Sequence, residues 1–122
     1  MISIGCSELK KIVKSGISSD DLNTRYDYSR VTDMSYLFAG ENRLEEIPFL
    51  ITSNVRNMSG MFFDCHSLLS VGRMDVSNVI ATDHIFHNCF CLGEFNPYDF
   101  PGFNFSRLSN PWVQLYYPEL CL

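Results

Sequence analysis

The chain is organised around the stretch Ser53-Asn54-Val55-Arg56-Asn57-Met58-Ser59-Gly60-Met61-Phe62-Phe63-Asp64-Cys65-His66-Ser67-Leu68. Its valine, phenylalanine and leucine recur at one constant spacing before and after this stretch, without a gap. The recurring residues are Val31, Val55 and Val79, then Phe38, Phe62 and Phe86, then Leu44, Leu68 and Leu92. An uninterrupted period of about 24 residues is typical of a solenoid, because each unit buries its apolar face only when a neighbour stacks on it.

Each repeat predicts one helix or helical turn followed by one short strand. In the first half, apolar residues stand three, six and seven positions after the valine, with Thr82 as the one exception, which places them on one stripe of a helix. Ser29, Ser53 and Ser77 stand where a helix start needs a hydroxyl acceptor. The second half, a leucine followed three residues later by another apolar residue, is short enough for a strand. We predict an α/β repeat, a short solenoid like that of leucine-rich repeats, with helix-strand units over residues 28–51, 52–75 and 76–99.

Residues 1–27 predict an N-terminal helical cap. They do not keep the repeat pattern, since the position one period before Val31 is the polar Ser7. Ser7 and Gly16 are placed to begin and end a short amphipathic helix, and the polar stretch 18–21 starts a second helical turn. The expected buried residues of the first helix are Leu9, Ile12 and Val13. Such a cap would cover the open end of the first repeat.

Residues 100–122 predict an aromatic C-terminal cap. The period fails after Asp99, and three prolines end the regular pattern. The aromatic residues of this segment are Phe100, Phe103, Phe105, Trp112, Tyr116 and Tyr117. They are most simply a lid over the last repeat.

Charge and composition narrow the class of partner. The chain has 122 residues and a formal net charge of −5, which disfavours nucleic acid and anionic membrane surfaces and favours a protein with a basic surface. No apolar run approaches the roughly 20 residues that span a bilayer. Without a secretory leader we expect a cytoplasmic protein, whose 5 cysteines are more simply free thiols than a disulfide framework.

The central stretch resembles the repeat of the BspA-like leucine-rich-repeat family. In that family, serine-asparagine-valine, asparagine-methionine-serine, methionine-phenylalanine and cysteine-serine-leucine elements recur at about this period. Residues 31–38 and 75–79 match it too, and the resemblance covers residues 28–99. Members are mostly bacterial surface proteins or lipoproteins. The resemblance implies adhesion or protein binding through the repeat face, with no catalytic residues to carry over.

Three histidines and three cysteines lie close together in the sequence. They are His66, His84, His87, Cys65, Cys89 and Cys91. Because Cys65 and Cys89 occupy equivalent repeat positions, a structural metal or a disulfide between them is an alternative to a column of buried thiols. Paired cysteines with a two-residue gap are absent, and nothing indicates an oxyanion donor for a catalytic cysteine. We therefore favour the buried thiols, with no metal and no cofactor.

The candidate binding residues stand where the repeats differ. Positions beside the strand leucines vary between repeats, and such positions face outward on the sheet surface of a solenoid. The predicted face consists of Glu45, Glu46, Phe49, Ser70, Arg73 and Glu94. A second candidate patch consists of Trp112, Tyr116 and Tyr117, which offer an anchor for a partner or for a second copy of the chain.

These observations predict a non-enzymatic protein-binding module. Its acidity and size suit an intracellular inhibitor, for example one encoded by a phage, that blocks a basic surface of a larger enzyme or nuclease. The alternative is a fragment of a bacterial surface adhesin or lipoprotein. A cysteine-histidine metalloenzyme is a third and weaker hypothesis.

Overall fold

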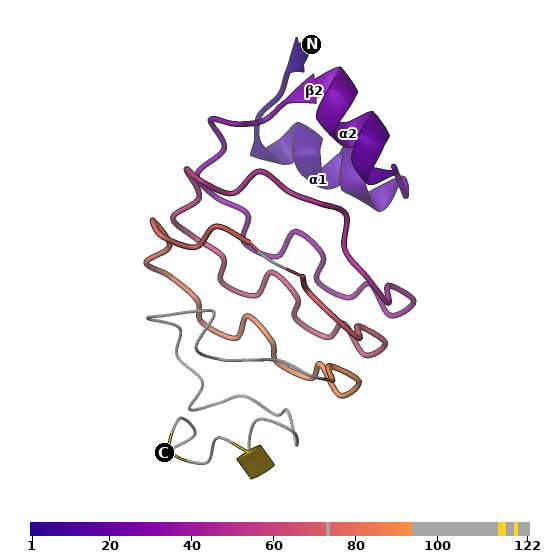
Figure 1. The fold of residues 1–122 in the computed structure, drawn as a ribbon, viewed down its shortest axis with the longest axis vertical. Coiled ribbons are helices and arrows are strands. Elements are labelled where there is room, and N and C mark those ends of the chain that lie inside the picture. Colours follow the sequence, from indigo (N-terminus) through magenta and orange to yellow (C-terminus); the bar gives the residue numbers. More distant parts are fainter. Residues whose placement is uncertain (73, 94–114, 117–118, 120–122) are drawn as a thin grey trace.

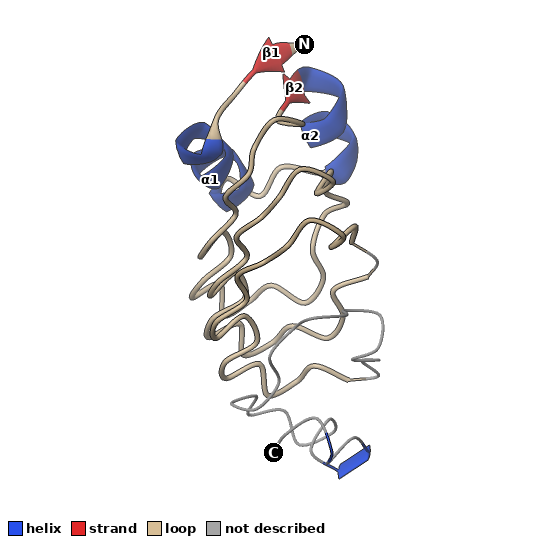
Figure 2. Cartoon of the chain, turned by 90° about the vertical axis from the view of Figure 1, so that its left-hand side faces the viewer, coloured by secondary structure: helices blue, strands red, loops and turns tan. Residues whose placement is uncertain are grey.

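The computed structural model describes residues 1–72, 74–93, 115–116 and 119. Two helices lie at the N-terminal end, and beneath them the chain winds back and forth in coils that lie one under another (Figure 1). We call residues 28–51 the first coil, 52–75 the second coil and 76–93 the third coil. The coils consist of loops and turns (Figure 2). Within the described part of the chain, no helix combines the length and apolarity that crossing a membrane requires.

Helix α1 (Cys6–Lys14) starts earlier than its sequence suggests. Its N-cap residue is Gly5, whose N–H donates to the Glu8 carboxylate at 3.0 Å. The prediction that Ser7 caps this helix is wrong, because Ser7 already lies in the first turn and Glu8 supplies the acceptor three residues after the cap. Gly16 follows the helix with a φ of 80°, which confirms the predicted left-handed ending.

Helix α2 (Ser19–Arg25) confirms the second predicted helical turn. The Ser18 hydroxyl accepts a hydrogen bond from the Asp21 N–H at 3.2 Å and so satisfies one free amide of the first turn. Each helix places one fully buried leucine in the core, Leu9 from α1 and Leu22 from α2. The other predicted core residues of α1 are half-buried against the same core: Ile12 and Val13.

Two short strands show that the cap fills one repeat period. β1 (Ile2–Ser3) pairs in parallel with β2 (Tyr26–Asp27), so that Ile2 lies opposite Tyr26, one period further along the chain. The prediction that residues 1–27 leave the repeat register is therefore wrong for these strands. The register survives in the backbone pairing, whereas the side chains between the strands follow the helical pattern of α1 and α2.

The coils are joined by the same hydrogen bonds at equivalent positions. From the first coil to the second, N–H groups donate to carbonyls at 2.8 to 3.0 Å in the pairs Met34–Asn57, Tyr36–Ser59, Phe38–Met61 and Gly40–Phe63. From the second coil to the third, the pairs are Met58–Ala81, Gly60–Asp83, Phe62–Ile85 and Asp64–His87, again at 2.8 to 3.0 Å. Parallel bridges join Asp33 to Asn57 and Asn57 to Ala81. Residues that match in the sequence therefore lie side by side in space.

The helices predicted for the first half of each repeat are not formed. Two positions in every coil are left-handed, with φ between 57° and 78°: Tyr36, Gly60 and His84, then Gly40, Asp64 and Asn88. A right-handed helix cannot continue through such residues. The N–H groups that a helix would use internally donate to the next coil instead, and turns with three-residue hydrogen bonds, such as Leu37 to Met34 at 3.2 Å, replace it. Among the described residues, the predicted strand is represented by one parallel bridge, between Glu46 and Ser70.

The polar residues at the start of each repeat link coils rather than cap helices. The Asn54 amide donates to the Ser29 carbonyl at 2.7 Å, and the Asn78 amide makes the same bond to Ser53. The Ser29 hydroxyl donates to the Asp27 carboxylate at 2.6 Å, in a local turn. The predicted capping role of these serines is therefore wrong, because no helix follows them.

The core is a set of columns that run through the coils. Phe38, Phe62 and Phe86 stack nearly parallel, with ring centroids 5.7 and 5.6 Å apart. Val55 and Leu68 are fully buried at the centre of their columns. Further buried members are Val31, Met34, Leu37, Met58, Met61, Ile85 and Leu92. Stacking hides the apolar face of each coil against its neighbours, and this burial is the main stabilising contribution.

Candidate functional site

The structure brings four of the predicted binding residues onto one surface. Glu45 and Glu46 of the first coil lie beside Leu69 and Ser70 of the second, because Glu46 bridges Ser70 and the Leu69 N–H donates to the Glu45 carbonyl at 2.8 Å. The side chains of these neighbouring residues, Glu45, Glu46, Leu69 and Ser70, are all exposed. Phe49, the fourth predicted residue, follows on the same segment and is 64% exposed. Exposure of a side chain as large and apolar as that of Phe49 is less common than exposure of glutamate or serine.

The structure says less about the remaining predicted binding residues. Arg73, Glu94, Trp112 and Tyr117 lie outside the described residues. Tyr116 is described and is exposed, as an anchor for a partner must be. The proposed association of two copies through the C-terminal aromatic residues stays a prediction.

Beyond the bridge between Glu46 and Ser70, the first two coils are no longer joined by backbone hydrogen bonds. Within the described residues, no backbone bond connects the segment 47–51 to the segment 71–75. Pro48 has no N–H to donate. At the far end of this gap, the hydroxyl of Thr52, the first residue of the second coil, donates to the carbonyl of Asp75, its last residue, at 2.8 Å. The bridge and this bond therefore bound an opening between the two coils, which we call the slot.

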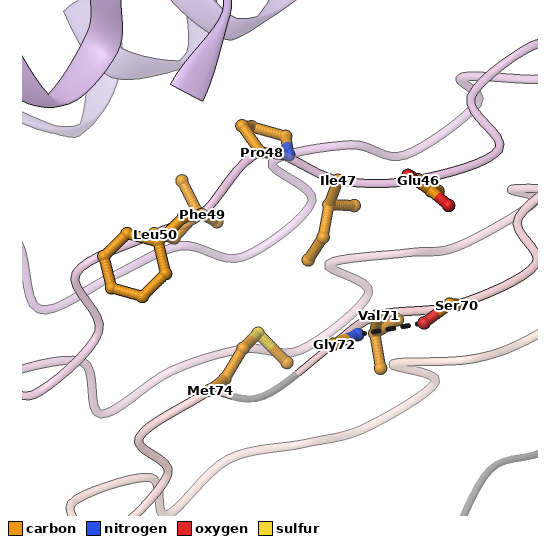
Figure 3. A pocket seen from close by; sticks show the side chains of 9 residues that line it. All are labelled: Glu46, Ile47, Pro48, Phe49, Leu50, Ser70, Val71, Gly72 and Met74. Carbon is orange, nitrogen blue, oxygen red and sulfur yellow. Dashed lines mark hydrogen bonds between the residues drawn. The ribbon is translucent and has the colours of Figure 1, made fainter. Parts of the chain in front are cut away.

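The slot contains two adjoining hollows. One has a volume of about 330 Å³ and is lined by Glu46, Ile47, Pro48, Phe49, Leu50, Ser70, Val71, Gly72 and Met74. In Figure 3 the Ile47 side chain points from the first coil toward the second, and the Met74 side chain points back. The second hollow, of about 400 Å³, is lined by Phe49, Leu50, Ile51, Thr52, Ser53, Met74 and Asp75. Phe49, Leu50 and Met74 line both, so the floor of the slot is apolar.

The rim of the slot is acidic. Among the described residues, neither Glu45 nor Glu46 makes an ion pair. The ion pairs of the described residues join Arg25 to Asp21 and His66 to Asp64. Asp75 accepts hydrogen bonds from the Ser77 hydroxyl at 2.6 Å and from the Ser77 N–H at 3.0 Å. These bonds lower the pKa of Asp75, so its carboxylate is charged at neutral pH. The slot thus combines an apolar floor with two carboxylates that line it, Glu46 and Asp75, and the exposed Glu45 precedes Glu46 in the chain.

The path of Phe49 is set by the cap. Its N–H donates to the Ser19 hydroxyl at 2.8 Å, and its carbonyl accepts from the Asn23 amide at 2.9 Å. The Ile51 N–H donates to the Tyr28 hydroxyl at 2.9 Å. The backbone of the first coil is therefore tied to α2 and to the residue after β2.

Sequence reasoning missed Leu50 and Met74 as site residues. It also missed a larger hollow, of about 510 Å³, between the cap and the first coil. Ile17 and Leu44 are among the residues that line this hollow, and it shares the segment 46–48 with the slot. Met74 carried a usable signal, because it is an apolar residue beside the variable Arg73.

The cysteines of the central columns are buried free thiols. Cys65 donates to the Phe38 carbonyl at 3.1 Å and Cys89 donates to the Phe62 carbonyl at 3.0 Å. Burial raises the pKa of Cys65 to about 11 and that of Cys89 to about 12. Both sulfurs therefore act as small buried donors, and neither has the lowered pKa of a nucleophilic thiol.

None of the three histidines lines the slot. His66 lies 4.0 Å from the Asp64 carboxylate, and His84 meets His87 edge to face at 5.6 Å between ring centroids. Among the residues that the structure describes, no three histidine, cysteine or acidic side chains are grouped to hold a metal ion.

Comparison with known proteins places the chain in a family. No curated protein and no solved structure matches it. A family model described as "Mycoplasma protein of unknown function, DUF285" matches residues 7–110. Since the match takes in most of the cap and all three coils, the chain belongs to the DUF285 family.

Proposed function

We propose that this chain is a non-enzymatic protein-binding module that holds an extended segment of its partner in the slot between the first and second coils. The observation that carries the proposal is the exposed Phe49, which stands over an apolar floor where two neighbouring backbones have no bonds to each other within the described residues. Apolar hollows that lie between two neighbouring coils can receive the side chains of an extended segment, and such side-chain pockets give peptide recognition its specificity.

The acidic rim suggests the chemistry of the bound segment. Glu45, Glu46 and Asp75 favour lysine or arginine next to the apolar side chain that enters the slot. The formal net charge of −5 would add long-range attraction toward a basic surface. A module of this kind suits an inhibitor that covers a basic surface of an intracellular enzyme.

The proposal includes the fold class. We propose a solenoid of the leucine-rich-repeat type, related to the BspA-like repeat. It is supported by the parallel bridges between residues one period apart and by the phenylalanine column. In such a solenoid the positions that vary between coils form the recognition surface.

A selection of random peptides tests the function. Twelve-residue peptides displayed on phage are selected against the immobilised full chain, and the affinity of the recovered peptides is measured by calorimetry. We expect sequences in which an apolar residue adjoins lysine or arginine. Phe49→Ala should weaken binding by about 10-fold or more, the effect of removing an interface anchor.

Phe90→Ala is the matched control. Phe90 is also an exposed phenylalanine, at 55%. It lies in the third coil, outside the slot, and its ring contacts His66 of the second coil. Its replacement should change the affinity by less than about 2-fold, as expected for a residue outside the interface. Equal losses in the two variants would contradict the proposal, and so would a selection that recovers no peptide.

The charge requirement is tested separately. Glu45→Gln combined with Glu46→Gln keeps the size of both side chains and removes their charges. The affinity for basic peptides should fall, and its dependence on salt concentration should become shallower, because screened carboxylate contacts are lost. An unchanged salt dependence would show that these carboxylates do not face the peptide.

A further inference from the structure

We infer that Asn23 and Tyr28 are positioning residues, which hold the backbone of Phe49 and Ile51 so that the slot stays formed and the Phe49 side chain stays at its rim. The inference rests on the proposed function of the slot and adds a second role to the N-terminal cap, which then shapes the recognition surface as well as covering the first coil.

The contacts form one continuous chain of hydrogen bonds. The Tyr28 hydroxyl accepts from the Ile51 N–H at 2.9 Å, so its own proton is free to donate to Asn23 Oδ1, 2.7 Å away. That bond fixes the orientation of the Asn23 amide. Nδ2 then donates one proton to the Phe49 carbonyl at 2.9 Å and the other to the Ser19 carbonyl at 2.8 Å.

Every side-chain polar atom of Asn23 and Tyr28 is therefore used. The Ser19 hydroxyl adds a further bond by accepting from the Phe49 N–H at 2.8 Å. Tyr28 is 1% exposed, so its hydroxyl has no access to bulk water as an alternative partner. A fully satisfied network with a buried member has one arrangement, and it imposes that arrangement on the segment it holds.

The second coil cannot make the contact of Asn23. The positions equivalent to Ser19 and Asn23 are Arg43 and Ile47, and an isoleucine side chain can neither donate nor accept a hydrogen bond. Among the described residues, the contact of Tyr28 has a counterpart in the bond from the Thr52 hydroxyl to the Asp75 carbonyl. The path of the segment 49–51 is thus a property of the first coil and of the cap beside it.

A tryptophan in place of Phe49 reports on this positioning without any partner. The chain has 1 tryptophan, Trp112, so Phe49→Trp in a Trp112→Phe background gives a single emitting residue. With Asn23 present, the indole should be held and its fluorescence anisotropy should be high. Asn23→Ala should lower the anisotropy at a temperature where circular dichroism shows the chain still folded, and Tyr28→Phe, which removes only the hydroxyl, should act in the same direction.

Asn54→Ala is the control for a general loss of stability. The Asn54 amide also donates to a backbone carbonyl, that of Ser29, at 2.7 Å and also links segments distant in sequence, but this bond does not involve the segment 49–51. This variant should leave the anisotropy of the tryptophan unchanged. For the selected peptides, Asn23→Ala should reduce affinity about 5- to 10-fold with Phe49 intact, mainly through faster dissociation.

The outcomes separate the two proposals. A lower anisotropy in Asn23→Ala and in Tyr28→Phe, but not in Asn54→Ala, supports the positioning role. An anisotropy that stays the same in both of the first two variants overturns it. A peptide selection without binders would refute the proposed function of the slot and leave the anisotropy result intact.

Discussion

The two halves of each coil differ in how they meet the next coil. In the first half, residues 31–41 and 55–65 make the same hydrogen bonds to the coil below and take left-handed φ at the same two places. In the second half, the first coil is tied to the cap and the second coil is not. We call these the uniform half and the variable half.

The uniform half contributes most of the stability of the fold, and the variable half carries the proposed recognition surface. The uniform half contains the phenylalanine column and the coil-to-coil ladder, so its changes act on all coils at once. The variable half contains the slot, whose exposed side chains contribute little to the folded state. Side chains there can change without loss of the fold, which is the condition for a site shaped toward one partner.

The largest effect should come from the centre of the uniform half. Phe62→Ala removes a ring that is 0% exposed and that stacks on both Phe38 and Phe86, so the free energy of unfolding should fall by about 3 to 5 kcal/mol. Urea denaturation measures this change. Leu69→Ala, in the variable half and half exposed, should cost less than about 0.5 kcal/mol. A comparable loss in both variants would contradict the division into two halves.

The second effect concerns pH. Unfolded thiols ionise near pH 9, whereas the pKa of Cys65 in the fold is about 11 and that of Cys89 is about 12. Because the folded state keeps its protons longer, the stabilisation is complete below pH 9 and is lost progressively as the pH rises toward 12. Unfolding by urea between pH 8 and pH 10.5 should show the decline.

A matched variant isolates the thiols. Cys65→Ala combined with Cys89→Ala should be less stable at pH 8 and should show a shallower decline above pH 9, since tyrosine and lysine ionisation remains in both proteins. Alkylation at pH 8 gives a second measure, in which the exposed Cys6 and Cys91 react and the two buried thiols do not. Equal slopes above pH 9 would show that the buried thiols do not contribute.

The uniform half could largely be predicted from the sequence. Phe62 recurs because it stacks on its counterparts Phe38 and Phe86, and such a contact leaves a trace at a fixed spacing in the sequence. The turns could not be told from a helix, because a turn that closes over three residues returns side chains to one side at nearly the same spacing. The left-handed positions of Tyr36 and His84 carry no signal, since only Gly60 among the three is a residue that favours that φ.

The site could be predicted only in part. Glu45, Glu46 and Ser70 stand out because they vary where their neighbours repeat. The slot itself depends on Asn23 and Ser19, which reach Phe49 across 26 and 30 residues of sequence. No repeat pattern indicates a contact between a helical cap and an irregular segment, so the shape of the site comes from the tertiary structure alone.

A smaller effect is expected at Gly60, in the uniform half. Gly60 has a φ of 61°, and a Cβ added there would overlap the ring of Tyr36 from the coil above. Gly60→Ala should cost about 1 to 2 kcal/mol through the left-handed backbone alone, with a further cost for moving the ring. Thermal unfolding of Gly60→Ala in the wild-type and Tyr36→Ala backgrounds separates the two costs. If the loss is the same in both backgrounds, the ring does not rest on Gly60.

The smallest effect should be a gain at His84. This residue is equivalent to Gly60 and has a φ of 57°, which an L side chain adopts at a cost, so His84→Gly should remove that strain. The edge-to-face contact with His87 is lost and the unfolded chain becomes more flexible, so the net gain should stay below about 1 kcal/mol. Asp83→Gly provides the contrast, because Asp83 is exposed but not left-handed, and glycine there should destabilise by about 0.5 to 1 kcal/mol. Opposite shifts in melting temperature for these adjacent residues would show that the left-handed turn is imposed by the stacked coils rather than chosen by the residue that occupies it. Shifts of the same sign would place the cause in the local sequence.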